Sequence, residues 1–198
     1  MADGLRRGAD GLERCEWCGD DPAYVAYHDE EWGRPLRGDD ALFELLSLEA
    51  FQAGLAWITV LRKRDALRSA FGGFAISRVA AFDAGDVERL LADSGIVRHR
   101  GKIEATIANA RAALALPSGL SDFLWSFAPS SPPPRPRSFA DVPATTGESE
   151  ALARALRQNG FRFVGPTTAY ALMQAAGMVD DHLAGCHRAG TCRLVPAG

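Results

Sequence analysis

Residues 148–177 read ESEALARALRQNGFRFVGPTTAYALMQAAG. Apolar residues recur with helical spacing over 148–158, and Gly160 ends that helix. A second helix is predicted over 167–176 and ends at Gly177. Gly165 lies in the short turn between them, and this pattern indicates two helices joined as a hairpin. The first N–H groups of the second helix are free to bind a phosphate, although the same pattern is also typical of an ordinary corner in a helical core.

The rest of the chain is also predicted to be helical. Asp39 or Asp40 is expected to cap a helix through the apolar residues 42–48, which Gly54 interrupts. Further helices are expected at 57–71, 83–92 (with Gly95 as a C-terminal stop), 102–116 and 121–127. The five prolines between 129 and 137 predict a surface loop. The predicted fold class is therefore all-α, and periodicity leaves open only short strands hidden in apolar runs.

Length and composition indicate one domain, which we place at residues 15–188 of the 198 residues. Residues 1–14 are rich in glycine and charge without an apolar segment, so we expect a disordered extension rather than a secretory signal. Residues 189–198 are expected to form a tail. No apolar run reaches the length of about 18 residues that a membrane span needs, so no membrane partner is expected.

The charge of the chain has two aspects. A net charge of −3 argues weakly against nucleic-acid binding. Basic residues nevertheless cluster at 62–64, at 98–102, and at Arg154, Arg157 and Arg162. An enzyme that grips only a few phosphates needs one basic face rather than a basic whole, so nucleic acid stays a candidate partner.

Cysteines and histidines lie near both ends of the predicted domain. Four cysteines in a chain without an export signal indicate reduced thiols or metal ligands rather than disulfides. Two cysteines and two histidines would form a closed, structural zinc site that ties the two ends together: Cys15, His28, His182 and Cys186. A rival set exists, because Cys18 forms a Cys-x-x-Cys with Cys15, and His187 and Cys192 are spare. Spacing alone does not choose between these sets, or between them and four unrelated residues.

A third group of residues is aromatic and acidic. Its members are Trp17, Tyr24, Tyr27, Trp32, Glu49, Gln52 and Trp57. Aromatic residues usually belong to the core, but residues 24–32 set them among charges, which a core tolerates poorly. Glu49 falls inside an apolar helical run, where a carboxylate is either a satisfied structural acid or a functional one.

The motifs together resemble one family. They are CEW at 15–17, YVAYHDEEWG at 24–33, LEAFQAGLAWITV at 48–60, GIVRHRGKI at 95–103, FRFVGPTT at 161–168 and DHLAGC at 181–186. Each motif alone is weak, but six in order over roughly residues 14–187 are strong. The chain is similar in all six to 3-methyladenine DNA glycosylase I, a helix-hairpin-helix DNA glycosylase.

The resemblance implies a fold, a metal and a pocket. It implies a helix-hairpin-helix fold with one structural Zn²⁺ held by Cys15, His28, His182 and Cys186, and so favours Cys15 over Cys18. It implies a base pocket of Tyr24, Tyr27, Trp57, Trp17 and Gln52 around Glu49, the expected catalytic and specificity residue. The expected DNA contacts are the wedge Leu55 and the turn residues Val164, Gly165 and Thr167. The expected substrate is double-stranded alkylated DNA, with free 3-methyladenine as product.

Asp180 departs from the family pattern. The wider helix-hairpin-helix superfamily carries a catalytic Asp in a Val-Asp-x-His setting, which the 3-methyladenine family as a rule lacks. This chain has Val179-Asp180-Asp181-His182, although a helix cap or a solvated acid is the preferred reading of Asp180. The alternatives are a broader base-excision glycosylase that uses Asp180 and a non-catalytic zinc-stabilised DNA-binding module. We expect a monomer in the cytoplasm, at the nucleoid during repair.

Overall fold

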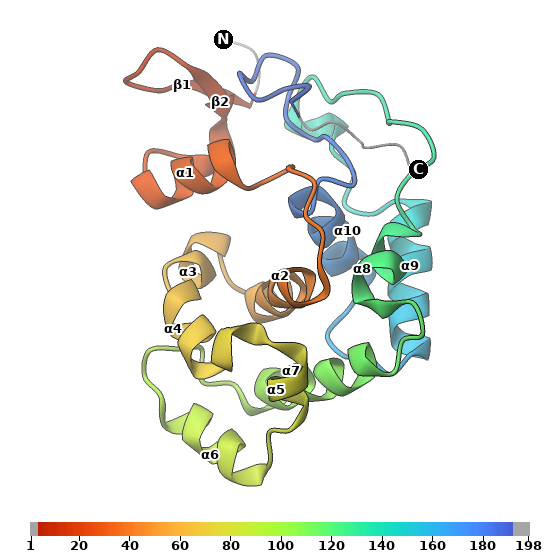
Figure 1. Ribbon diagram of the computed structural model, residues 1–198. Coiled ribbons are helices and arrows are strands. Elements are labelled where there is room, and N and C mark those ends of the chain that lie inside the picture. Colours follow the sequence, from red (N-terminus) through yellow and green to blue (C-terminus); the bar gives the residue numbers. More distant parts are fainter. Residues whose placement is uncertain (1–3, 192–198) are drawn as a thin grey trace.

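The computed structural model describes residues 4–191, which are mostly helical. Ten α-helices follow a short β-hairpin in that range (Figure 1). The α-helices are α1 (Pro22–Glu30), α2 (Asp39–Gln52), α3 (Trp57–Leu61), α4 (Arg64–Ala70), α5 (Ile76–Ala80), α6 (Ala84–Ala92), α7 (Arg100–Leu114), α8 (Gly119–Trp125), α9 (Gly147–Gln158) and α10 (Pro166–Ala175). The other elements are β1 (Leu5–Arg7), β2 (Glu13–Cys15) and the 3-10 helices η1 (Glu16–Cys18), η2 (Gly72–Phe74) and η3 (Phe139–Asp141). Within residues 4–191, no helix has both the length and the apolar character that would let it cross a bilayer.

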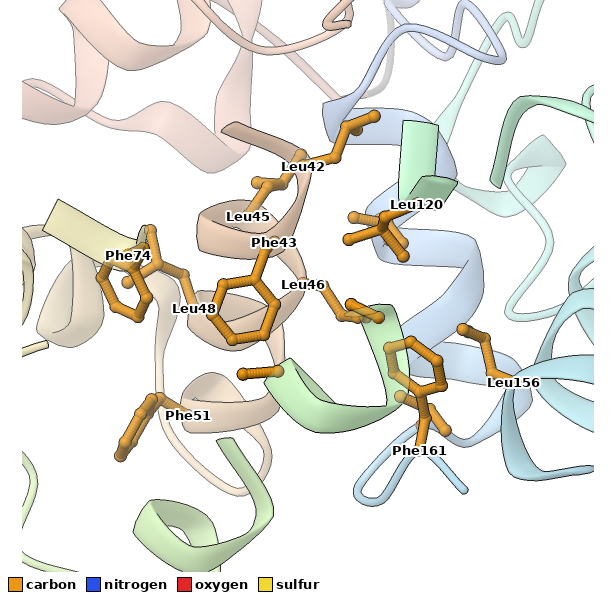
Figure 2. Close-up of a cluster of buried hydrophobic side chains, with 14 of the residues drawn as sticks. Leu42, Phe43, Leu45, Leu46, Leu48, Phe51, Phe74, Leu120, Leu156 and Phe161 are labelled. Carbon is orange, nitrogen blue, oxygen red and sulfur yellow. The ribbon is translucent and has the colours of Figure 1, made fainter. Parts of the chain in front are cut away.

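Helix α2 lies at the centre of the domain. It contacts α3, α5, α7, α8 and α10, and nearly all of its residues from Leu42 to Phe51 are buried. Figure 2 shows its side chains between Phe74 on one side and Leu120, Leu156 and Phe161 on the other. A helix that is apolar on nearly all sides is buried on nearly all sides, which explains why Leu42–Phe51 lacks a clear amphipathic stripe.

The predicted helices are confirmed where a cap and an apolar stripe coincide. Helix α6 begins with a capping box at Asp83, and α9 begins with one at Thr146. Helices α7, α9 and α10 also lie within two residues of the expected bounds. The proline-rich segment between α8 and η3 contains no helix or strand, as expected.

Three details of the prediction were wrong. Asp39 and Asp40 do not cap their own helix: their carboxylates accept hydrogen bonds from the N–H groups of Ser121 (2.8 Å) and Ile76 (2.9 Å). The expected helix over 57–71 is two helices, because the chain turns at residues 62–63 between α3 and α4. Helix α6 is followed by an extended Asp93 rather than by a left-handed glycine at Gly95.

The expected disorder of residues 1–14 is wrong for the part that the structure describes. Residues 5–15 form an antiparallel β-hairpin in which Leu5 pairs with Cys15 and Arg7 with Glu13. The buried guanidinium of Arg14 holds it in place by hydrogen bonds to Asp29 of α1 and to Asp10. The fold is therefore mostly helical rather than all-α. Residues 1–3 and 192–198, the latter most of the expected tail, lie outside the described residues.

The two ends of the described chain lie side by side. Figure 1 shows the segment after α10 beside the β-hairpin. The N–H of His187 donates to the carbonyl of Glu13 (2.8 Å), and Leu183 packs with Cys15 and Cys186 in a small cluster of its own. This arrangement brings the N-terminal and C-terminal candidate ligands together.

Candidate base-binding cavity

A cavity of about 300 Å³ opens where α1, α2 and α10 meet. All six residues that the sequence assigned to the base pocket line it. Its lining is Trp17, Tyr24, Tyr27, Trp32, Glu49, Gln52, Trp57, Phe139, Val142, Ala171, Gln174 and Asp181. Residues from both ends of the chain, from Trp17 to Asp181, therefore line the same cavity.

Helix α1 supplies the tyrosines of the cavity. Asp21 caps this helix by accepting from the N–H groups of Ala23 (3.0 Å) and Tyr24 (3.3 Å). A spacing of three residues then puts Tyr24 and Tyr27 on one helix face. Tyr27 is almost fully buried, and burial raises the pKa of its hydroxyl.

The aromatic rings form a connected set around the cavity. The ring centroids of Tyr27 and Trp57 are 5.3 Å apart, with 43° between their planes. Trp17 lies 5.2 Å from Tyr24 and 5.0 Å from Trp32, again centroid to centroid. Tilted pairs at these distances hold each other in place by ordinary aromatic packing. The set can accept a flat ligand against its faces.

Glu49 is a buried acid without a partner. It is 5% exposed, and none of residues 4–191 donates a hydrogen bond to its carboxyl group. Burial raises its pKa from 4.5 to about 8, so the group is mostly neutral at pH 7. The buried Nε1–H of Trp57 also lacks an acceptor in the described chain. A carboxyl group that lines a cavity without a donor from the protein is free to bind a ligand there.

The loop after α2 carries the predicted wedge. Gly54 turns the chain with a φ of +82°, a left-handed conformation that glycine adopts without strain. The Nε2 of Gln52 donates to the carbonyl of Leu55 (3.0 Å), which ties the cavity lining to this loop. Leu55 itself is 37% exposed and does not line the cavity, so it projects outside.

Sequence reasoning missed the far wall of the cavity. Asp181 follows α10 and is buried, and its Oδ2 accepts from Tyr170 (2.6 Å) and from Gln174 of α10 (2.7 Å). Phe139 and Val142 come from η3 and the residue after it. Asp181 lies in the motif at 181–186, but its sequence does not indicate a place in the cavity, and Phe139 and Val142 lie in ordinary local patterns, so all three reach the cavity only through the fold.

Asp180 does not line the cavity. Its carboxylate accepts hydrogen bonds from the N–H groups of His182 (3.3 Å) and Gly190 (2.9 Å) and pairs with Arg135 (3.2 Å). These contacts favour the interpretation of Asp180 as an acid that organises the C-terminal segment.

The four candidate metal ligands meet in one buried cluster. One ligand atom each from Cys15, His28, His182 and Cys186 lies within 4.8 Å of all the others. The Sγ of Cys186 is 3.5 Å from Nε2 of His28 and 3.6 Å from Nδ1 of His182. Contact with Cys15, together with hydrogen bonds from the two histidines, lowers the pKa of the Cys186 thiol, whereas the pKa of Cys15 is raised. Such a cluster of thiols and imidazoles could bind a metal ion.

The surroundings of this cluster suit a metal site. His28 uses its other nitrogen on the carboxylate of Asp29 (2.7 Å), and His182 uses its other nitrogen on the carbonyl of Trp32 (3.2 Å). Second hydrogen bonds of this kind orient histidine ligands. Burial opposes ionisation of Asp29, yet hydrogen bonds from Arg14, His28 and His187 hold its pKa well below the ordinary value. Cys18 is buried but stands outside the cluster.

Helices α9 and α10 are joined by residues 159–165, which we call the interhelical turn. Val164 is buried and anchors it, whereas Thr167 is exposed in the first turn of α10. Gly165 is the N-cap, no side chain caps α10, and the space where a side chain at Gly165 would lie is open. The start of α10 is therefore accessible from outside.

Comparison with known proteins identifies the family of this chain. The family model for methyladenine glycosylase matches residues 17–189. DNA-3-methyladenine glycosylase 1 of Escherichia coli strain K12 is 49% identical, over 88% of this chain and 96% of the relative. A crystal structure of 3-methyladenine DNA glycosylase I superposes with a TM-score of 0.85 and 50% identity, covering 88% of this chain and 98% of that one. A variant of such an enzyme, in complex with 3-methyladenine, superposes with a TM-score of 0.83 and 37% identity over 88% and 96%. The resemblance inferred from the sequence is confirmed, and the chain belongs to the methyladenine glycosylase family.

Proposed function

We infer that this chain is a DNA glycosylase that removes 3-methyladenine from alkylated DNA. The observation that carries this conclusion is the buried, unpartnered Glu49 in an aromatic cavity, in a chain 49% identical to a DNA-3-methyladenine glycosylase. The reaction breaks the bond between C1′ of the sugar and the base. Water adds to C1′, the bonding electrons go to the base, and the proton lost by water goes to solvent.

The charge of the substrate explains the cavity. Adenine methylated at N3 is a cation while attached to the sugar and leaves as a neutral base, so little acid catalysis is needed. Catalysis then rests on selection, orientation and electrostatics. A flipped base stacked on the aromatic lining of the cavity, which includes Tyr27 and Trp57, gains roughly 1–3 kcal/mol. A cation gains about 2 kcal/mol more from a desolvated aromatic face, and normal adenine lacks this gain.

Glu49 supplies the second part of the selection. In the free protein the carboxyl is mostly neutral, because burial raises its pKa to about 8. A cationic base stabilises the carboxylate of Glu49 by forming an ion pair with it, and the exocyclic amine of the base donates a hydrogen bond to that carboxylate. Neutral adenine provides no such stabilisation, so the carboxyl stays mostly protonated beside it and the gain from a charge pair is absent.

The DNA contacts are proposed from the accessible segments near the cavity. Leu55 fills the gap that the flipped base leaves in the stack, and Gln52 keeps its loop attached to the cavity. The backbone N–H groups of the interhelical turn, around Val164, Gly165 and Thr167, bind a phosphate in the manner of a helix-hairpin-helix element. The open space beside Gly165 supports this approach.

The metal is proposed to be one structural Zn²⁺ at Cys15, His28, His182 and Cys186. Zn–S bonds of about 2.3 Å and Zn–N bonds of about 2.0–2.1 Å separate sulfur and nitrogen ligands by about 3.5 Å in a tetrahedron. The contacts of Cys186 with both histidines match that separation. Four protein ligands leave no position for an activated water, so the ion would hold the two ends of the chain together rather than take part in the reaction. We propose a monomeric protein that works in the cytoplasm, at the nucleoid.

Release of bases from methylated duplex DNA tests this function. The purified protein should release 3-methyladenine, identified by chromatography, and should not release adenine from unmodified DNA. Glu49→Gln should abolish most of the release, whereas Glu44→Gln, on the same helix but paired with Arg68 outside the cavity, should keep it. DNA binding without any base release would identify a non-catalytic module. Broad release of several bases that Asp180→Asn abolishes would identify a different glycosylase.

A further inference from the structure

Phe163 has an unusual backbone for its residue type. In residues 4–191, only Phe74 and Phe163 combine a side chain with a positive φ, at +53° and +55°. Bulky residues rarely adopt this left-handed conformation, because it costs free energy that glycine does not pay. Phe74 is fully buried in the core, so packing offsets its cost. Phe163 is 42% exposed, so burial does not explain its conformation.

The neighbours of Phe163 fix the direction of its ring. Asn109 of α7 clamps the backbone of Arg162 on both sides: its Oδ1 accepts from the N–H (2.7 Å), and its Nδ2 donates to the carbonyl (3.1 Å). Val164 on the other side is buried. The ring lies edge-on to His99, with centroids 6.3 Å apart and 81° between the planes. The ring is therefore held at the surface, in the middle of the interhelical turn.

The start of α7 lies between the interhelical turn and residues 53–56, which carry Leu55 and which we call the wedge loop. The Nζ of Lys102, in the first turn of α7, donates to the carbonyls of Phe51 (2.9 Å) and Ala53 (2.7 Å), just before Leu55. The ring of Phe163 lies over Gly101 in that same turn. The two exposed apolar side chains, Leu55 and Phe163, thus flank the start of α7.

This surface also carries positive charge. Arg98 and Arg162 are exposed there, and neither forms an ion pair with any residue from 4 to 191. An exposed apolar ring in segments that also carry unpaired arginines complements a nucleic-acid strand, whose sugars are apolar and whose phosphates are anionic. Continuity with the wedge loop selects duplex DNA as the occupant.

We propose that Phe163 is a DNA-contact residue whose ring packs on a deoxyribose of the strand held by the interhelical turn. The inference rests on the proposed function for the identity of the partner. A sugar contact is the same for every sequence, so Phe163 should strengthen binding to damaged and undamaged duplexes alike. Because the contact is apolar, it should not change the number of counterions that binding releases.

Two substitutions separate a DNA contact from a structural role. Phe163→Gly removes the ring and also relieves the left-handed backbone, whereas Phe163→Ala removes the ring and keeps the strain. We expect a melting temperature at or above that of wild type for Phe163→Gly, and one close to wild type, below that of Phe163→Gly, for Phe163→Ala. Both should bind an undamaged duplex about tenfold more weakly than wild type, with an unchanged slope of log affinity against log salt. Leu114→Ala, at the other end of α7 with 59% exposure, is the control and should bind as wild type does.

Several outcomes would overturn the proposal. Wild-type affinity in Phe163→Gly would do so, as would a shallower salt slope, which indicates a lost phosphate contact. Weaker binding together with a lower melting temperature of Phe163→Gly would also do so, because the ring would then support the turn itself. The proposed function is checked separately: wild-type protein that releases no 3-methyladenine would refute it, while the effect of Phe163 on duplex affinity could still stand.

Discussion

Replacement of Glu49 by glutamine should stabilise the protein while it removes activity. Burial raises the pKa of Glu49 from 4.5 to about 8, so between these pH values the native state keeps a proton that the unfolded chain has lost. Wild-type stability therefore falls by about 1.4 kcal/mol per pH unit across this window, apart from other groups. The loss in free energy of unfolding that Glu49 causes is about 3 kcal/mol at pH 7 and approaches about 5 kcal/mol above pH 8. Glutamine is neutral throughout and avoids this loss.

The assay is chemical denaturation of both proteins at pH 5, 7 and 9 with equal zinc. Subtracting wild type from Glu49→Gln isolates Glu49, because the other titrating groups are common to both. The gain in free energy of unfolding should be small at pH 5 and largest at pH 9. At every pH, Glu49→Gln should release less 3-methyladenine than wild type in a single turnover, and Glu49→Ala should release still less. Glu44→Gln should show no gain that grows with pH. A Glu49→Gln protein that is less stable than wild type, or that is folded and cleaves at full rate, would refute the reasoning.

Four further predictions follow from the same geometry. The kcat/KM of the wild type for release of 3-methyladenine should rise with pH up to about 8, because the cationic base needs an ionised Glu49. The pH–rate profile of Glu49→Gln should lack this rise. Cys15→Ala should lose bound zinc and on the order of 10 kcal/mol of stability, whereas Cys18→Ala should keep the metal, as metal analysis and melting curves would report. Gly165→Asp should weaken binding to damaged and undamaged duplexes equally. Unchanged duplex affinities would mean that the interhelical turn only connects two core helices. Asp180→Asn should cleave nearly as wild type does, and an inactive folded variant would reverse its assignment.

Local sequence predicted those parts of the fold that local interactions determine. The capping boxes of α6 and α9 and the apolar stripe of α7 are contained in the helices themselves. Asp39 and Asp40 were misassigned because their partners, Ser121 and Ile76, lie far along the chain. The β-hairpin was missed for a similar reason, since it is held by contacts with α1 and the C-terminal segment rather than by its own composition.

The candidate site divides in the same way. Glu49 could be predicted because a carboxylate in an apolar helix contradicts its surroundings, and this contradiction is visible in the sequence. The sequence around Asp181 and Gln174 contains no such contradiction, and only the packing of α10 against α2 places these residues in the cavity. Phe163 looks like an ordinary apolar turn residue until its φ of +55° and its exposure are known.

The meeting of the two chain ends has a consequence for the order of events during synthesis. Cys15 and His28 leave the ribosome early, but their partners in the cluster, His182 and Cys186, are made near the end. The thiol of Cys15 therefore stays without its partners while the central helices form around α2, and any metal that this cluster binds would be acquired late in maturation. The base cavity waits too, since Asp181 belongs to its wall. A nascent or prematurely ended chain would thus carry the wedge loop and Glu49 without a finished cavity, and such a chain would be unable to cut bases from the genome before its own completion.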